Sequence, residues 1–142
     1  MLSIHPYHAH RIFDGTKTAE LRRTRPQLSA GDQVLVYVSS PIQALLGGFE
    51  VATVVEASPV ELWRQIFKYA AVSSEMFQKY FAGADTGYAI QVKRAWKFAQ
   101  PTPLNTLRSL IPGFHPPQIF RYLNKREIRR LGLVPTTLRN EA

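Results

Sequence analysis

The pattern of apolar and polar residues along the chain predicts short strands separated by short helices. The clearest strand is at 33–39, where β-branched and apolar residues follow a Gly-Asp turn. The segment 17–23 is extended but highly charged, which predicts a strand exposed on one side. The glycine pair Gly47-Gly48 inside another β segment predicts a bulge or a sharp barrel corner. The expected strands span residues 2–4, 17–23, 33–39, 44–56 and 87–98.

Apolar residues at helical spacing, together with capping residues, predict four short helices. Gly15 is placed to end the first helix in a left-handed conformation, and Asn124 and Glu127 have capping-box spacing at the start of the last. The proline-rich stretch 101–117 is expected to be irregular, with about one turn of helix near 104–110. The helices are expected at 6–14, 58–67, 73–81 and 124–132, and the third is expected to turn three residues inward: Met76, Phe77 and Tyr80.

Non-adjacent, bulged strands with short helices between them favour the α+β class over a parallel βαβ sheet. We expect a small mixed β-barrel of about five strands, with short helices around it. A length of 142 residues favours one domain, and a hydrophobic share of 45% is enough for a core. The domain is expected to span residues 1–134, and residues 135–142 are expected to form a loose tail.

Composition excludes several classes of site. The chain has no Cys, which excludes disulfides, zinc ribbons and thiol nucleophiles. No apolar run reaches the ~20 residues that span a membrane, and the N-terminus lacks the features of a signal peptide. We therefore expect a cytoplasmic protein with no membrane partner and no cofactor.

The net charge of +8 is concentrated at the two ends of the chain. Residues 1–30 carry five basic and two acidic side chains, and residues 93–142 carry ten and two. Residues 31–92 carry three basic and six acidic side chains, so the middle is negative. We expect the two basic ends to meet across one cleft, which suits a polyanion such as nucleic acid. The alternative is a basic surface that serves only solubility.

Three histidines within six residues raise the question of a metal site. His5, His8 and His10 lack the i, i+4 spacing that zinc ligands on one helix need, and no paired carboxylate lies nearby in the sequence. On a helix His8 and His10 would point to different sides. We therefore expect no metal, and interpret these histidines as surface or ligand-contacting residues.

The charged segment after Gly15 is the strongest candidate for chemistry. On a strand, Glu20 and Arg22 share one face while Leu21 points to the core on the other. Lys17 would lie at the junction between the predicted helix and the strand. The alternative interpretation is an edge strand that its charges protect from aggregation.

The same segment, G-T-K-T-A-E-L-R, fits the G-x-K-x-x-E-x-R signature of the ASCH domains, a branch of the PUA-like β-barrel superfamily. Further segments resemble that family at 31–41, 47–55, 87–92 and 116–123, where P-P-Q is followed by F-R-Y-L. Together they cover most of residues 2–123. The resemblance implies a PUA-like mixed β-barrel with a cleft beside the motif strand, and a role in RNA binding or RNA processing.

The resemblance also implies which residues line that cleft. Lys17, Glu20 and Arg22 match the defining signature. One branch of the family, which acts on acetylated cytidine, uses a Lys-x-x-Thr pattern with the Thr as nucleophile. This chain has Glu20 at that place and Thr18 at a different offset, which argues against that amidohydrolase activity. Matches to the longer segment patterns add Tyr37, Ser39 and Gln118.

The chemistry of these side chains suits RNA. Lys17 offers a compact charge to a phosphate or a developing oxyanion, and Arg22 offers a bidentate fork. Glu20 accepts a hydrogen bond from the exocyclic amino group of a base, or acts as a general base. Tyrosines stack unpaired bases. The expected RNA-binding set is Lys17, Glu20, Arg22, Arg23, Tyr7, Tyr37, Ser39, Gln118 and Arg121.

Basic residues of the last predicted helix would extend the track for the RNA backbone. Arg126, Arg129 and Arg130 share one helical face, next to Lys125 and after Arg121. The alternative is an ordinary solvated face.

Three functions remain open at this point. The first is a module that binds single-stranded RNA or a modified nucleoside without catalysis. The second is a metal-independent ribonuclease or nucleoside hydrolase that uses Lys17 and Glu20, where a histidine is the alternative group to move the proton. The third is a protein-interaction domain in transcription or translation regulation, whose basic face meets an acidic partner. We favour the first.

Overall fold

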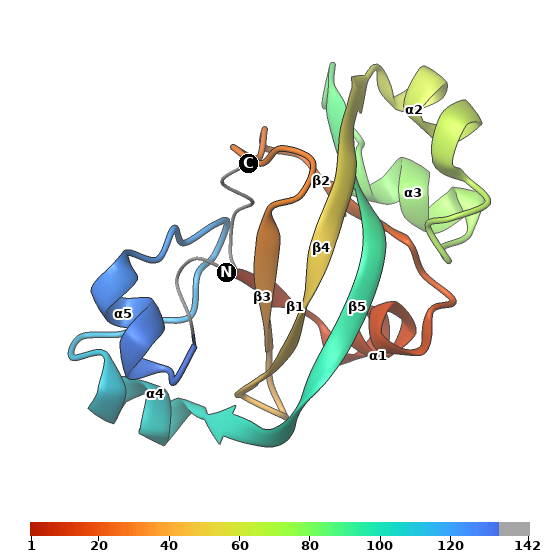
Figure 1. The fold of residues 1–142 in the computed structure, drawn as a ribbon. Helices are drawn as coiled ribbons and strands as arrows, with labels where there is room; N and C mark the ends of the chain where they lie inside the picture. The colour runs from red at the N-terminus through yellow and green to blue at the C-terminus, as the bar shows by residue number, and fades with distance from the viewer. Residues whose placement is uncertain (134–142) are drawn as a thin grey trace.

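A computed structural model of the chain describes residues 1–133, and the predicted end of the domain at 134 and the tail at 135–142 lie outside the described residues. Five strands form one mixed sheet in the order β1-β3-β4-β5-β2 (Figure 1). β1 runs parallel to β3, and the other neighbours are antiparallel. The strands are β1 (Leu2–Ile4), β2 (Ala19–Arg22), β3 (Gln33–Val38), β4 (Ala44–Ala57) and β5 (Gly87–Pro103).

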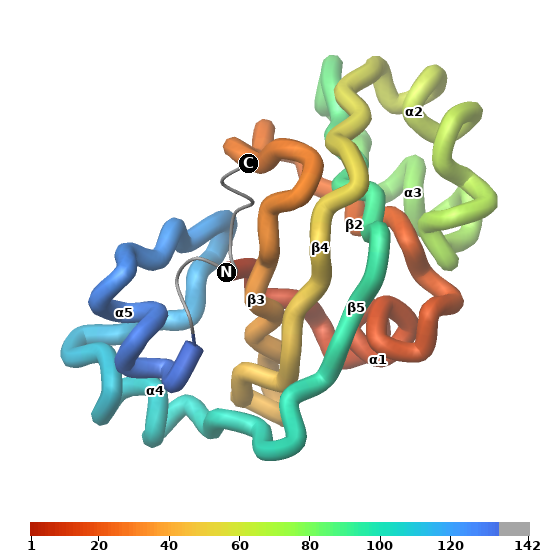
Figure 2. The backbone as a smooth tube through the Cα atoms, in the orientation of Figure 1, coloured from red at the N-terminus to blue at the C-terminus, as the bar shows by residue number. Residues whose placement is uncertain are grey.

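Five helices surround this sheet, and their ends follow local capping rules. Gly15 ends the first helix with φ 86°, as predicted. Asn124 and Glu127 form both hydrogen bonds of the predicted capping box. Figures 1 and 2 show α2 and α3 on one side of the sheet and α4 and α5 on the other. The helices are α1 (Pro6–Asp14), α2 (Pro59–Ile66), α3 (Ser74–Tyr80), α4 (Leu104–Leu110) and α5 (Lys125–Arg130).

The α+β class and the five strands are confirmed, but the sheet does not close into a barrel. It curves strongly (Figure 2), yet no backbone ladder joins its edge strands, β1 and β2, within residues 1–133. The Arg22 guanidinium crosses this gap and donates from Nη2 to the Ser3 carbonyl oxygen at 3.1 Å. Side chains of both strands line the opening between the two edges.

The glycine pair in β4 marks a bulge, as predicted. The register of β4 against β5 shifts between Leu45 and Gly47. A Cβ on Gly47 would lie 2.0 Å from the Trp96 carbonyl oxygen, and one on Gly48 would lie 2.7 Å from that of Val34. Only glycine allows the strands to approach so closely at this point.

Two strands differ from the sequence prediction. β5 continues to Pro103, through the stretch expected to be irregular, because its end pairs with Ala44 and Leu45 of β4. β2 is shorter than expected and is not exposed on one side, since Ala19, Glu20 and Leu21 are all buried. The helices α2 and α3 and the segment between them cover this part of the sheet.

The core divides into three clusters that the curved sheet separates. β3 shows the division most clearly, because its successive side chains point to opposite faces. Val34, Val36 and Val38 pack inside the curve with α1, whereas Leu35 and Tyr37 pack outside it against α4 and Phe114. The third cluster joins α2 and α3 to β2 and β5. Among the described helices, none is long and apolar enough to cross a membrane.

Candidate functional site

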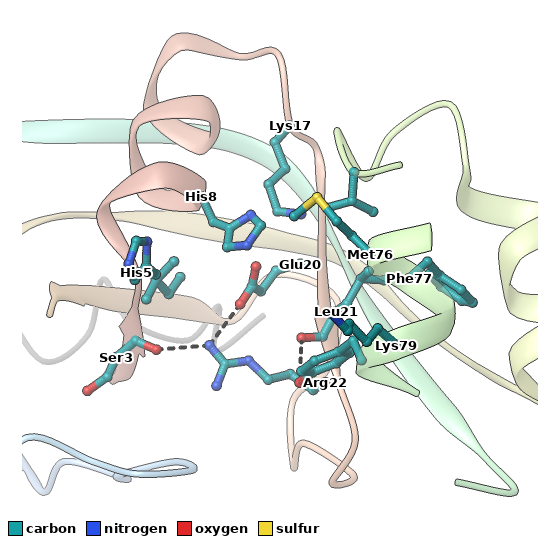
Figure 3. Close-up of a pocket in the computed structure, with 13 residues that line it drawn as sticks. Ser3, His5, His8, Lys17, Glu20, Leu21, Arg22, Met76, Phe77 and Lys79 are labelled. Carbon is teal, nitrogen blue, oxygen red and sulfur yellow. Dashed lines mark hydrogen bonds and ion pairs between the residues drawn. The ribbon is translucent and has the colours of Figure 1, made fainter. Parts of the chain in front are cut away.

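A pocket of about 500 Å³ lies at the opening between the two edge strands (Figure 3). β1, α1, β2 and α3 all contribute to its wall. Its volume falls within the range of sites that hold small molecules. The polar and charged residues on the side of β1, α1 and β2 are Ser3, His5, His8, Lys17, Glu20 and Arg22.

Glu20 and Arg22 form an ion pair inside this pocket. The Arg22 Nη2 and Glu20 Oε2 atoms are 2.8 Å apart, and both side chains are largely buried. They lie on one face of β2 while Leu21 joins the cluster under α2 and α3, as the two-residue period predicts. Figure 3 shows the guanidinium held between the Glu20 carboxylate and the Ser3 carbonyl oxygen. A buried guanidinium fixed in this way is preorganised to bind an anion.

Lys17 is buried at the inner wall of the pocket, with 1% of its surface exposed. Its Nζ donates a hydrogen bond to the Ala70 carbonyl oxygen, in the segment between α2 and α3. Burial lowers the pKa of Lys17, and the Glu20 carboxylate partly opposes that shift. Through this hydrogen bond, Lys17 links the segment between α2 and α3 to the start of β2. It also places a positive charge at the pocket wall.

His8 faces the same space from α1. Figure 3 shows its imidazole beside the side chains of Lys17 and Glu20. Burial and then the Lys17 charge lower the pKa of His8 below its ordinary value of 6.5. The imidazole is therefore largely neutral near pH 7, which is the form that accepts a proton.

Three buried polar atoms of the pocket have no hydrogen-bond partner within residues 1–133. They are Ser3 Oγ, His8 Nδ1 and Arg22 Nε, from three different elements. Buried polar atoms in native proteins are nearly always satisfied. Because all three residues line one cavity, the cavity wall has hydrogen-bonding capacity that residues 1–133 do not use.

The opposite wall of the pocket is mostly apolar and belongs to α3 and its approach, and Lys79 of α3 adds a charged side chain to it. Met76 and Tyr80 are 43% and 42% exposed and face the pocket, so the prediction that both point into the core is wrong; Phe77 is buried as predicted. The Tyr80 hydroxyl donates to the Leu21 carbonyl oxygen at 3.3 Å, and burial raises the pKa of Tyr80. This wall offers a flat, partly aromatic surface to a ligand. Its apolar and aromatic residues are Leu21, Val72, Met76, Phe77 and Tyr80.

Arg23 and Tyr7 do not line the pocket. Arg23 Nη1 donates to the carbonyl oxygens of Tyr80 and Ala82, at 2.6 and 3.1 Å, and so holds the end of α3 against β2. The ring of Tyr7 lies under the Arg11 guanidinium, 3.6 Å from it, on the exposed side of α1. Arg23 thus positions the apolar wall of the pocket instead of forming it.

Tyr37, Ser39, Gln118 and Arg121 also lie away from the pocket. Tyr37 is 2% exposed and packs against Phe114 on the other face of the sheet, so its ring is not available to stack a base. Ser39 donates its backbone N–H to Ile4, and Gln118 is exposed. Arg121 lines a separate cavity of about 230 Å³ and pairs with Glu127. The residues added by the segment matches outside the signature therefore do not line this pocket.

The two ends of the chain do meet, though not across the pocket. The backbone of Arg121 exchanges hydrogen bonds with that of Met1 at 2.6 and 3.0 Å. Phe120 lines the second cavity, and its ring centroid lies 5.9 Å from the guanidinium of the pocket residue Arg22. α5 contributes no residue to the pocket, so its arginines do not continue the pocket wall.

Three features of the pocket were not predicted from the sequence. These are the presence of Ser3, the position of His8 next to Lys17 and Glu20, and the wall that α3 forms. The histidine cluster did indicate ligand-contacting residues in the sequence, since His5 and His8 line the pocket while His10 is exposed. Within residues 1–133 no three His, Cys, Asp or Glu side chains are grouped so as to hold a metal ion. Ser3 had no signal, because a lone serine in a short strand is unremarkable without its neighbours.

Comparisons with known proteins agree with this geometry. A ribonuclease from Zymomonas mobilis, described as containing an ASCH domain, is 27% identical over 92% of this chain and 88% of its own length. The crystal structure of ASCH from Zymomonas mobilis matches with a TM-score of 0.87 at 26% identity, covering 92% of this chain and 91% of the other.

A third relative is the large ribosomal subunit protein uL22 of Ureaplasma parvum, which is 30% identical over 74% of this chain. The match spans 34% of that longer protein, about a third of it. The sequence model of the ASCH domain matches residues 2–102, which include every strand apart from the last residue of β5. On these grounds the chain belongs to the ASCH domain family.

Proposed function

We propose that this protein binds single-stranded RNA and takes one unpaired nucleotide into the pocket between β1, β2, α1 and α3. The observation that carries the proposal is the set of three unsatisfied buried polar atoms, Ser3 Oγ, His8 Nδ1 and Arg22 Nε, around one cavity. A nucleotide supplies both the hydrogen-bonding groups that these atoms lack and a negative phosphate for Lys17 and Arg22. The ribonuclease named among the relatives supports RNA as the ligand.

The two walls of the pocket suit the two parts of a nucleotide. The apolar wall on α3, with Met76 and Tyr80, packs against the flat face of a base. The polar wall, with Arg22 and Lys17, faces the phosphate and ribose. Glu20 accepts a hydrogen bond from an exocyclic amino group of the base. A base is available for this only in an unpaired strand, which is why the proposal specifies single-stranded RNA.

Fluorescence anisotropy with labelled single-stranded RNA of mixed sequence tests the binding. We expect Arg22→Ala to weaken binding by about tenfold or more, because it removes a charge-assisted contact. The matched control is Arg64→Ala, which removes an exposed arginine on α2 outside the pocket. Thermal melting followed by circular dichroism confirms that both variants are folded. Absence of binding at low salt would overturn the proposal and favour a protein partner instead. Equal affinities of the two variants would overturn the role of the pocket.

A second candidate function, metal-independent cleavage of the bound RNA, is favoured by the neutral imidazole of His8 beside Lys17. In this reaction His8 Nδ1, or Glu20, takes the proton of a ribose 2′-hydroxyl. The 2′-oxygen then bonds to the adjacent phosphorus, the bond from phosphorus to the 5′-oxygen breaks, and that oxygen takes a proton from water. Lys17 stabilises the charge on the phosphate.

The same RNA incubated with the protein in EDTA tests the cleavage. The expected products carry 2′,3′-cyclic phosphate and 5′-hydroxyl ends. His8→Asn and Glu20→Gln should each keep most of the binding, and the variant that removes the base should lose cleavage. RNA that is bound but stays intact would rule out cleavage and leave the binding proposal unaffected.

A further inference from the structure

α5 carries an exposed positive surface whose cations have no ion-pair partner within residues 1–133. These cations include Lys125, Arg126 and Arg129, which are all exposed. The acidic residue of the helix, Glu127, is already paired with Arg121. Several exposed cations elsewhere are paired: Arg25 with Glu56, Arg64 with Glu61, and both Lys93 and Arg94 with Glu50. Others are exposed and unpaired within residues 1–133, but they lie singly in different segments and do not form a cluster as on α5: Lys68, Lys79, Lys97 and Arg108.

This surface is separate from the pocket. Leu123 and Leu131, which flank α5, pack against the outer cluster that contains Leu35, and Ile128 of α5 lines the second cavity. Figures 1 and 2 both place α5 on the other side of the sheet from α2 and α3. Its cations therefore need a ligand of their own, or a ligand long enough to reach both places.

An aromatic pair lies between the pocket and α5. The ring centroid of Phe120 is 5.9 Å from the guanidinium of the pocket residue Arg22. The ring of Tyr122 stacks on Phe120 with a centroid distance of 6.3 Å and an angle of 29°. Tyr122 is 54% exposed, and its hydroxyl accepts a hydrogen bond from the Gln27 backbone at 3.0 Å, which fixes the ring. Two residues later, Asn124 caps α5.

We propose that the Phe120–Tyr122 pair and α5 form a second contact surface for the same single strand of RNA. A strand that leaves the pocket at Arg22 stacks a base on Tyr122 and places its phosphates against Lys125, Arg126 and Arg129. An exposed aromatic ring beside uncompensated cations is the combination that binds single-stranded nucleic acid. An acidic protein segment would use the cations alone. The inference rests on the proposed function, and it adds that the bound RNA extends beyond the pocketed nucleotide.

The test compares a short and a long RNA, of about 4 and about 16 nucleotides, which bracket the site sizes of small single-strand binding domains. One variant carries Lys125→Gln, Arg126→Gln and Arg129→Gln, since glutamine keeps the helix propensity. A second carries Tyr122→Leu. The matched control, Arg64→Gln, Lys68→Gln and Lys93→Gln, removes the same charge from α2, the segment after it and β5. Binding is measured at several salt concentrations.

For the long RNA, the α5 variant should bind roughly tenfold to a hundredfold more weakly at ~0.1 M salt, with the salt slope lower by about 2, since each phosphate contact on a single strand contributes ~0.7. Tyr122→Leu should also weaken the long RNA, and binding of the short RNA should not change. An α5 variant that binds the long RNA as tightly as wild type, or no more weakly than the control, would overturn the inference.

Arg22→Ala, measured in the same series, separates the two proposals. If the long RNA depends on Arg22 but not on α5, the pocket proposal stands and the second surface is refuted. If it depends on α5 but not on Arg22, the pocket proposal fails and the basic surface alone binds RNA.

Discussion

Replacing Lys17 with methionine tests the buried ammonium that joins the pocket wall to the segment between α2 and α3. Methionine has a similar length and keeps the packing, but it cannot donate to the Ala70 carbonyl oxygen. That carbonyl would then be buried without a partner. Glu20 would keep its ion pair with Arg22 at 2.8 Å, so no second buried charge is stranded.

The expected cost follows from two opposing effects. An unsatisfied buried acceptor costs about 1–3 kcal/mol. Burying the charged ammonium also costs free energy, as the lowered pKa of Lys17 indicates. The methionine variant avoids this desolvation cost, which offsets part of the loss. We expect Lys17→Met to lower the free energy of unfolding by about 1–2 kcal/mol, because the cost of the unsatisfied carbonyl exceeds the desolvation cost that the variant avoids. The melting temperature should fall by roughly 3–8 °C.

Urea denaturation followed by circular dichroism measures this change. The control is Lys79→Met, an exposed lysine on α3, which should change stability by less than about 0.5 kcal/mol. A Lys17→Met protein as stable as the control, or more stable than wild type, would refute the view that this ammonium supports the fold.

The pH dependence of stability provides a second test of the role of Lys17. Because the pKa of Lys17 is lowered in the folded state, the folded protein releases this proton first as pH rises. Wild type therefore gains stability between the lowered pKa and the ordinary value of 10.5, and the methionine variant lacks this gain. The difference between the two proteins should widen as pH rises through that window. A constant difference would contradict the lowered pKa.

Two further predictions concern the bulge and the pocket histidine. Gly47→Ala should destabilise the fold by about 3 kcal/mol in urea denaturation, because its Cβ meets the Trp96 carbonyl oxygen; Gly83→Ala, with open space at a left-handed φ, should cost only about 1 kcal/mol. His8 should titrate by NMR below 6.5, and its contribution to stability should be lost as pH falls from 6.5 through that lowered pKa. Similar costs at the two glycines, or a midpoint at or above 6.5, would count against these interpretations.

Local features of the chain were predictable because neighbouring residues determine them. Gly15 adopts the left-handed conformation that ends α1, and the Asn124 capping box starts α5, as the spacing predicted. The two-residue period of β2 placed Glu20 and Arg22 on one face, where they form an ion pair. The three signature residues, Lys17, Glu20 and Arg22, all line one pocket.

Predictions that depended on which surface lies opposite a residue were less successful. Met76, Phe77 and Tyr80 are all apolar at helical spacing, but only Phe77 among them is buried under α2. Tyr37 alternates with Val36 and Val38, and α4 covers the face on which it lies. A hydrophobic side chain tends to avoid water. Its hydrophobicity alone does not show whether it packs in the core or lines a ligand pocket.

The sequence was sufficient to place the five strands approximately, most helix ends, the positive charge and the family signature, although β2 and β5 differ in length from the prediction. The tertiary structure decided which charges became a site. It buried Lys17 by bringing Ala70 against it from 53 residues away, and it left β1 and β2 unpaired, so that Ser3 and Arg22 face one cavity. It also placed α5 away from that cavity. These outcomes depend on contacts between distant segments, whose geometry is set by the packing of the whole sheet and its helices instead of by local spacing.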